Sequence, residues 1–442
     1  MHVNIVILHA HALGRYLANY GRPVETPQLM KFGQTATAFR KAFAAAPVRS
    51  PSQAALFCGQ MPHLLGMLGP VERGFALTHE KSHIAHVLGA AGYESVHAGV
   101  QHLFADDAAL PFERVLAPQG ADGLERDLST AQQVCAFLRE RAATPSPDKK
   151  LFFLVCGFSL AMRPFIKAAE DAEGLFSAPA CGLPDTPQTR GDFSDYRHNI
   201  SFLDNCVGEV LQTLEQTGRF EDTLIVFTTD CGGPFPMAMG QLTDEGIGVS
   251  LLVHYPGNPS AGKVSDALVS QLDIFPTLCD FAGIEPPQWL AGHSLRPIFE
   301  RKRSSVREEL MAQSTYFAAY EPMRCIRTTR YKLVKRYDPD SRPVAVNIPD
   351  SPSKDALYEA GWGLRDRPQI ALYDLTLDPL EQSNLYDIDS MWSVQVDLLA
   401  RMEGFLRETL DPLMKGFVPP PKGTRVNHRS QRSASEPTCA YE

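Results

Sequence analysis

Short apolar runs alternate with amphipathic helical patterns over residues 1–310, and this alternation limits the fold more than any other feature of the chain. Such an order is typical of an α/β protein with a mostly parallel sheet covered by helices on both faces. The expected strands are residues 3–9, 94–99, 151–157, 223–229 and 248–255. The first, third and fourth of these runs are expected at the buried centre of the sheet.

Four stretches have the spacing of amphipathic helices. One begins at Thr26-Pro27, and the others cover residues 79–91, 195–217 and 271–282. No internal repeat is visible in the chain. The predicted core domain therefore consists of one continuous α/β unit.

The pattern changes after residue 310. Residues 323–336 alternate as one or two antiparallel strands should, residues 371–375 read as another strand, and residues 391–409 as a helix. These predict a small C-terminal α+β subdomain over residues 311–418. Residues 419–442 are rich in Pro, Ser and Arg and too poor in apolar residues to form a core. They predict either a flexible tail or an arm that lies on a partner subunit.

Composition excludes several classes of protein. The chain has 442 residues, 44% of them hydrophobic and 21% charged, with a net charge of −9. This charge argues against a nucleic-acid surface, and no apolar run approaches the roughly 20 residues that span a membrane. The first residues enter a core strand without a basic leader, and nine scattered cysteines are typical of reduced thiols. We therefore expect a cytoplasmic location, with no nucleic-acid or membrane partner.

One segment, residues 46–59, contains the signals of a sharp strand-to-helix turn. Ser50 is expected to cap the helix, Pro51 to be its first residue, and Gly59 to end it. Turns of this kind present a side chain at the edge of a sheet. The residue in this position is Arg49.

This segment resembles the nucleophile segment of the sulfatases, a branch of the alkaline phosphatase superfamily, which is usually written C-x-P-S-R. Further stretches resemble sulfatase motifs in the same order along the chain, and they are residues 4–21, 26–29, 223–230, 240–257 and 372–385. The resemblance implies an alkaline phosphatase-like fold.

The resemblance also assigns family positions to individual residues. Arg49 stands where sulfatases have the Cys that becomes formylglycine, and Gln53 where the motif ends in Arg. Two calcium-binding Asp correspond to His11-Ala12, and a later Asp-Asn or Asp-His pair corresponds to Asp230-Cys231. One carboxylate, one imidazole, one methyl and one thiol do not supply the oxygen ligands of calcium. We therefore expect the family's calcium site to be lost and no cofactor to be present.

The remaining catalytic positions of the family differ in the same way. Val100 replaces a Lys while His102 is kept, Ser159 and Met162 replace two His, and Met239 replaces a second Lys. The sequence thus predicts a degenerate active site. The residues expected to line its binding cleft are His11, Arg49, Ser50, Gln53, His102, Ser159, Asp230, Cys231 and Met239.

Two functions remain open at this stage. One is a non-hydrolysing or strongly impaired sulfatase homologue that binds a small anionic ligand or a sulfated glycan. The other is a hydrolase of sulfate or phosphate esters with a site that does not use formylglycine. Variable loops that select the ligand are expected at residues 101–128, 166–194 and 339–368. A homo-oligomer is also compatible with the sequence.

Several residues carry alternative interpretations. Arg49 is expected to form a salt bridge with Asp230 in the former calcium position, although it could instead bind an anion. His11, Asp230 and Cys231, together with His102, could hold a zinc ion if a metal is present. His102 is either a remnant of a catalytic acid or a structural histidine. Arg15 and Arg163 either contact an anionic ligand or are solvated at the rim of the cleft. Ser50 is a weak candidate for a replacement nucleophile.

Overall fold

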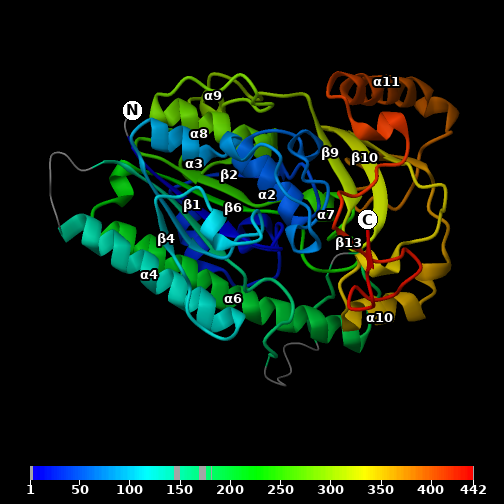
Figure 1. Ribbon diagram of the computed structural model, residues 1–442, viewed down its shortest axis with the longest axis horizontal. Coiled ribbons are helices and arrows are strands. Elements are labelled where there is room, and N and C mark those ends of the chain that lie inside the picture. Colours follow the sequence, from blue (N-terminus) through cyan, green and yellow to red (C-terminus); the bar gives the residue numbers. More distant parts are fainter. Residues whose placement is uncertain (1–2, 144–149, 169–175, 181, 442) are drawn as a thin grey trace.

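The computed structural model describes residues 3–143, 150–168, 176–180 and 182–441. Their main feature is an eight-stranded sheet with the strand order β4-β3-β5-β1-β6-β7-β2-β8 (Figure 1). These strands are β1 (Asn4–Ala10), β2 (Thr37–Phe43), β3 (Glu94–Gly99), β4 (Arg114–Leu116), β5 (Phe152–Phe158), β6 (Thr223–Thr229), β7 (Leu251–His254) and β8 (Val264–Ser270). Only β7 is antiparallel to its neighbours. The mostly parallel sheet predicted from the sequence is confirmed.

The centre of the sheet consists of β5, β1 and β6. These three strands run parallel, and every residue in them is buried. The predicted central position of the corresponding apolar runs is therefore confirmed. The carboxyl ends of the three strands meet at one edge of the sheet, where ligands of open α/β folds commonly bind.

Helices cover both faces of this sheet, as Figure 1 shows. Along β1, Ile5 and Ile7 pack on one side, and Val6 and Leu8 on the other. The first side receives α2 (Arg49–Cys58), α3 (Ile84–Ala90), α8 (Ile274–Ala282) and α9 (Arg296–Phe299). The second side receives α1 (Pro27–Gly33), α4 (Gly123–Ala143) and α6 (Pro187–Gln216).

A second, antiparallel sheet follows in the order β12-β11-β10-β9. Its strands are β9 (Glu309–Tyr316), β10 (Tyr320–Thr328), β11 (Tyr331–Arg336) and β12 (Ile370–Asp374). The helix α11 (Trp392–Glu408) packs its Leu398, Met402 and Leu406 against this sheet. The predicted C-terminal α+β unit is confirmed, and it also contains α10 (Pro352–Glu359).

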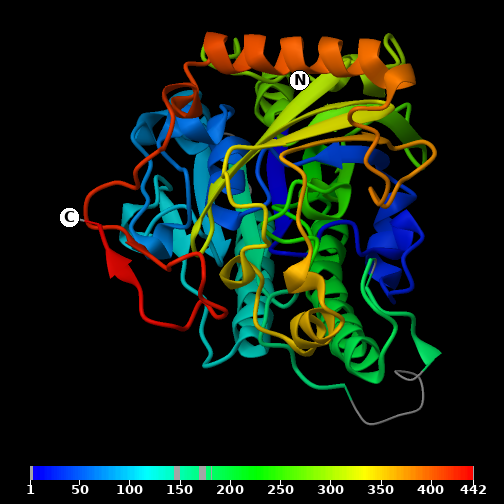
Figure 2. The same cartoon turned by 90° about the vertical axis from the view of Figure 1, so that its right-hand side faces the viewer.

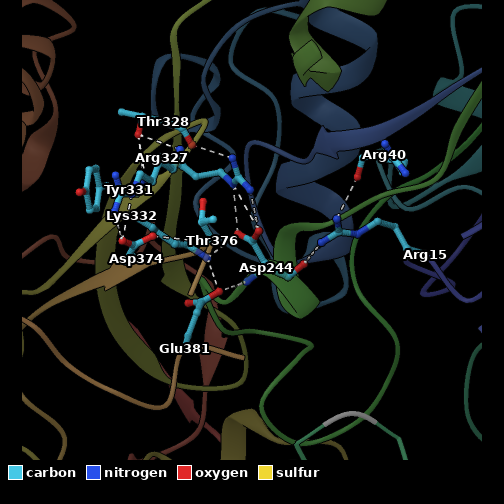
Figure 3. A network of polar contacts seen from close by, with 11 residues as sticks. Arg15, Arg40, Asp244, Arg327, Thr328, Tyr331, Lys332, Asp374, Thr376 and Glu381 are labelled. Carbon is cyan, nitrogen blue, oxygen red and sulfur yellow. Dashed lines mark hydrogen bonds and ion pairs between the residues drawn. The ribbon is translucent and has the colours of Figure 1, made fainter. Parts of the chain in front are cut away.

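A buried network of charges connects the second sheet to the core (Figure 3). The Lys332 ammonium on β11 donates to Asp244 at 2.8 Å and to Glu381 at 2.7 Å. Asp244 begins the short helix α7 (Asp244–Ile247) and also accepts from Arg327 on β10 at 2.9 Å. Burial alone would raise the pKa of Asp244, but the charges of Lys332 and Arg327 hold it well below its usual range. The network therefore fixes the start of α7 against the second sheet.

Residues 419–441 of the final segment lie against earlier parts of the chain (Figure 2). It includes the strand pair β13 (Arg425–Val426) and β14 (Cys439–Ala440). Asn427 donates its backbone N–H to the Ala318 carbonyl at 2.9 Å, and Arg432 forms an ion pair with Asp355 on α10 at 2.7 Å. Each of these contacts is intramolecular and holds the segment against its own chain. The other predicted alternative, an arm that lies on a partner subunit, stays a prediction.

Several boundaries differ from the predictions. The strands β2 and β8 were missed, and the long helix α4 lies partly within a range predicted to be a variable loop. The helices α6 and α10 likewise begin inside the predicted loops 166–194 and 339–368. The predicted helix over 79–91 is shorter, since α3 covers only Ile84–Ala90. In the described part of the chain, no helix has both the length and the apolar character needed to cross a bilayer.

Candidate functional site

The residues singled out from the sequence gather where the central parallel strands end. His11 follows β1, Ser159 follows β5, and Asp230 follows β6. The helix α2 begins beside them with Arg49 and turns Gln53 toward His11. Because β1, β5 and β6 are parallel, their carboxyl ends bring these side chains together.

Asp230 is completely buried and has two close partners. Its Oδ2 lies 3.0 Å from Nδ1 of His11, and its Oδ1 accepts the backbone N–H of Ala12 at 2.8 Å. Burial alone would raise the pKa of this carboxyl, but the hydrogen bond and the charge of His11 hold it well below its usual range. Nε2 of His11 lies 3.1 Å from the carbonyl oxygen of Val100. The Asp230 carboxylate and the Val100 carbonyl can only accept hydrogen bonds, so each is suited to an N–H group of this ring.

Arg49 does not contact Asp230. Its Nη2 donates to Oε1 of Glu72 at 2.9 Å, and its Nη1 lies 3.7 Å from the sulfur of Met162. The predicted salt bridge between Arg49 and Asp230 is therefore wrong. The physical reason is that His11 already compensates the buried carboxylate, which leaves the guanidinium to pair with a carboxylate nearer the surface.

Gln53 connects two histidines. Its Nε2 lies 3.0 Å from Nδ1 of His11, and its Oε1 accepts the backbone N–H of His102 at 3.0 Å. The His11 ring makes edge-to-face contacts with His9 and His102, with ring centroids 4.7 Å apart in both cases. Burial and the charge of His11 lower the pKa of His102 well below its ordinary value. His102 is therefore neutral, and its buried Nε2 has no hydrogen-bond partner among the described residues.

The two serines near the site are already engaged. Ser50 does not cap α2, because the N-cap is Val48 and no side chain bonds to the first turn. The Ser50 hydroxyl instead accepts the backbone N–H of Val71 at 3.0 Å. Ser159 donates its hydroxyl to Asp127 at 3.0 Å, and burial raises the pKa of Asp127 to about 6. The predicted end of α2 at Gly59 is confirmed by its left-handed backbone, with φ of 69°.

Apolar groups fill the remaining space around Asp230. Ala12, Cys231 and Met239 form one cluster, against which Met162 and Phe317 pack. Burial raises the pKa of the Cys231 thiol well above its ordinary value, so the thiol stays protonated. Among the described residues, no three His, Cys, Asp or Glu side chains are grouped so that they could hold a metal ion.

A cavity of about 280 Å³ opens beside Arg49. Of the two arginines expected at the rim, Arg163 lines this cavity, whereas Arg15 donates to the backbone oxygens of Asp244 and Arg40. The lining residues are Arg49, Glu72, Arg73, Met162, Arg163, Pro234, Met239, Phe317, Ala318, Val346, Ile348, Pro349 and Ala434. The lining thus combines four charged residues with otherwise apolar ones.

Comparison with known proteins decides the family. The sulfatase family model matches residues 4–284, and a model described as the C-terminal part of N-sulphoglucosamine sulphohydrolase matches residues 240–350. The chain belongs to the sulfatase family.

Two human members of the family align with most of this chain. N-sulphoglucosamine sulphohydrolase of Homo sapiens is 27% identical over 414 residues, which cover 82% of this chain and 81% of the relative. Arylsulfatase A of Homo sapiens is also 27% identical, over 86% of this chain and 83% of the relative. An ulvan-active sulfatase of Formosa agariphila, at 27% identity, aligns with 51% of this chain and 39% of its own length.

Solved sulfatase structures share the same fold. A 2-O GAG sulfatase superimposes with a TM-score of 0.71 at 20% identity, covering 95% of each chain. A second structure, solved in complex with its substrate D-glucosamine-2-N,6-O-disulfate, has a TM-score of 0.70 at 17% identity and covers 93% of this chain and 99% of the other. These likenesses extend over both sheets of the family fold.

Sequence reasoning missed two residues that shape the site. Glu72 pairs with Arg49 and Asp127 pairs with Ser159, but each is separated from its partner by more than twenty residues and lies in no recognisable motif. Only the helical spacing of α4 could have indicated that Asp127 lies on the buried face of a helix.

Proposed function

We propose that this sulfatase-family protein binds a small sulfated or phosphorylated ligand beside Arg49 and does not cleave it by the formylglycine route. The observation that carries the proposal is the position of Arg49. It is the first residue of α2, its guanidinium reaches the cavity, and its partner Glu72 is half exposed. A guanidinium at a helix N-terminus is suited to hold an oxyanion.

The chemistry of the surrounding groups supports binding rather than turnover. A guanidinium is permanently charged and has no lone pair available for attack on sulfur or phosphorus. The hydroxyls of Ser50 and Ser159 are bonded to Val71 and Asp127, and neither of these partners is a histidine base. Neither hydroxyl is therefore part of a serine–histidine pair of the kind that activates a nucleophile.

The donor set at Asp230 does not fit the calcium ion of the family. Calcium takes six to eight oxygen ligands, whereas the groups beside Asp230 are the Ala12 methyl, the Cys231 thiol and the His11 ring. Both Asp230 oxygens already accept hydrogen bonds from His11 and Ala12. We propose that the His11 imidazolium supplies the positive charge that a metal would otherwise supply.

One observation favours the alternative of a rebuilt hydrolase. His102 is neutral, lies against His11, and has a buried Nε2 without a partner among the described residues. A neutral imidazole could serve as a general base if a ligand placed a water molecule beside it. This alternative predicts hydrolysis that depends on His102.

A paired assay separates the two functions. Purified protein is incubated with 4-nitrophenyl sulfate and 4-nitrophenyl phosphate, and binding of the same compounds is measured by calorimetry. Our proposal predicts saturable binding, product formation at the buffer rate, and an unmodified peptide over residues 42–72 by mass spectrometry. Turnover that falls to background in His102→Ala would support the alternative instead.

A further inference from the structure

A second cavity, of about 600 Å³, follows the strand β8. The consecutive residues 263–268 all line it. Successive side chains of a strand point to opposite faces of a sheet, so a cavity over one face would be lined by alternate residues only. The unbroken run therefore indicates that the cavity lies along the edge of β8. We call it the β8 groove, and its further lining includes Arg301, Arg303, Ser304 and Ser305.

The backbone of β8 is open along its outer edge. β8 is the last strand of the eight-stranded sheet, and in the described part of the chain it pairs only with β2. The Lys263 carbonyl accepts the N–H of Ala38 on β2 at 3.0 Å. In a planar trans peptide the next N–H points the opposite way, so Val264 turns its N–H away from β2. An open strand edge of this kind is a template for an added strand.

The β8 groove is positively charged, although the whole chain has a net charge of −9. Three exposed cations line the groove, and they are Lys263, Arg301 and Arg303. None of them forms an ion pair with a carboxylate of the described residues. The carboxylate in the lining, Asp266, is already held by Arg40, whose Nε and Nη2 donate to it at 2.8 and 2.6 Å. The groove therefore presents three cations whose charge is not compensated by the protein.

Charge and composition limit what can occupy this edge. Two copies of the chain paired edge to edge would bring like charges together, which destabilises paired strands. Among the described residues that line the groove, none is aromatic, so the bases of a single-stranded nucleic acid would have no side chain to stack on. An extended peptide with carboxylate side chains satisfies both features, because its main chain can pair with β8 while its carboxylates meet the cations.

From these observations we infer that β8 accepts an extended acidic segment of another protein as an additional strand, with its carboxylates bound by Lys263, Arg301 and Arg303. The groove includes Thr37 at the amino end of β2, whereas the candidate site lies at the carboxyl ends of β1, β5 and β6. The strands β6, β7 and β2 separate β1 from β8. The inference therefore does not rest on the proposed function.

Fluorescence anisotropy with labelled peptides of about eight residues tests the class of partner. The acidic probe alternates Glu with Val, the basic probe has Lys in place of Glu, and the third probe is the acidic peptide with every backbone nitrogen methylated. We expect saturable binding of the acidic probe and at least about tenfold weaker binding of the other two, because one lacks the matching charge and the other lacks main-chain donors.

Variants of the full chain test the two parts of the site, with folding checked by thermal unfolding. Val264→Pro removes the outward N–H but no bond to β2, and it should weaken the acidic probe by about three- to tenfold. Lys263→Gln combined with Arg303→Gln should weaken it by a similar factor of about three to ten. Arg407→Gln, at an exposed position near the end of α11 and outside the groove, is the matched control and should change nothing.

Hydrogen exchange of the natural chain gives a readout that needs no variant. The acidic probe should slow amide exchange over residues 264–268, because the outward N–H groups become bonded to the added strand. Unchanged exchange there would contradict strand addition.

The remaining outcomes also decide the inference. Equal binding of the acidic and basic probes would overturn the selection by charge, and equal binding of the methylated probe would overturn pairing through the main chain. A single-stranded DNA of eight thymidines that binds as tightly as the acidic peptide would show a nucleic-acid surface instead. If no probe binds, the inference fails, and the charges along β8 then serve only to keep copies of the chain apart.

Discussion

At the scale of single residues, the pairing of Asp230 decides how the site is built. Its carboxylate is buried and depends on His11 and on the Ala12 N–H, whereas Arg49 pairs with the half-exposed Glu72. Leaving a buried charge without its partner costs much more than opening an ion pair near the surface. Removing His11 should therefore cost much more stability than removing Arg49.

Replacing His11 should destabilise the protein strongly. We expect His11→Leu to lower the free energy of unfolding by about 3–5 kcal/mol, because Asp230 loses its charged partner. Arg49→Cys should lower it by less than about 1 kcal/mol and should not restore sulfatase turnover. Urea unfolding measures both values, with Glu72→Gln as the control. A larger loss for Arg49→Cys than for His11→Leu would mean that Arg49, and not His11, compensates Asp230.

The depressed pKa of Asp230 predicts a dependence of stability on pH. The contribution of an ionised Asp230 is fully present above its unfolded value near 4 and decreases as the pH falls toward the lower folded value. The stability difference between the natural chain and Asp230→Asn should therefore be constant from pH 7 to about 5 and shrink between pH 4 and 2.5. Urea unfolding at several pH values measures it. A difference that does not change with pH would show that Asp230 is not ionised in the folded protein.

The sequence indicated which residues lie near one another at the candidate site, but not which side chains form pairs. The order of motifs placed His11, Gln53 and Asp230 at neighbouring strand and helix ends, and the fold brings them together. Which carboxylate Arg49 meets depends on the path of the chain around residue 72, for which the sequence contains no local signal. Long side chains select partners in three dimensions, and spacing along the chain does not encode that choice.

At the scale of elements, the charge network around Lys332 fixes the start of α7 against the second sheet (Figure 3). Lys332→Met should lower the free energy of unfolding by about 3–5 kcal/mol, because Asp244 and Glu381 would remain as two neighbouring buried carboxylates. Lys335→Met is the control, since this lysine on the same strand pairs with the partly exposed Glu403 and its loss should cost less than about 1 kcal/mol. Equal losses in both variants would contradict the importance of the buried network.

The helices and strands also differ in how clearly the sequence predicts them. The runs that form β1, β5 and β6 are predominantly apolar because both of their faces are buried, so their position was predicted correctly. By contrast, β2 and β8 include exposed residues and charged side chains, which weaken the apolar signal. The helix α4 buries two polar residues, Asp127 and Thr130, at the start of its apolar face, and this obscured its amphipathic pattern.

At the scale of the whole molecule, the C-terminal segment holds together regions that are distant in sequence (Figure 2). Arg429 forms an ion pair with Asp338, and the Arg432 carbonyl accepts from the buried Lys354 on α10. Removing residues 428–442 should speed amide exchange over residues 345–359 while β1 and β6 stay protected, because the deletion removes contacts to α10 but none to the central strands. Hydrogen exchange measured by mass spectrometry checks this. Unchanged exchange over residues 345–359 would show that the segment does not stabilise this region.

Calcium titration of the purified chain tests the central claim most directly, because that claim is that His11 replaces the metal charge beside Asp230. Family-type sites need several oxygen ligands, and weak calcium sites still bind at about 0.1–1 mM. Calorimetry should therefore detect no stoichiometric binding up to about 1 mM calcium. Binding of one calcium ion per chain that disappears in Asp230→Asn would contradict the account and would make a metal-dependent hydrolase the better description.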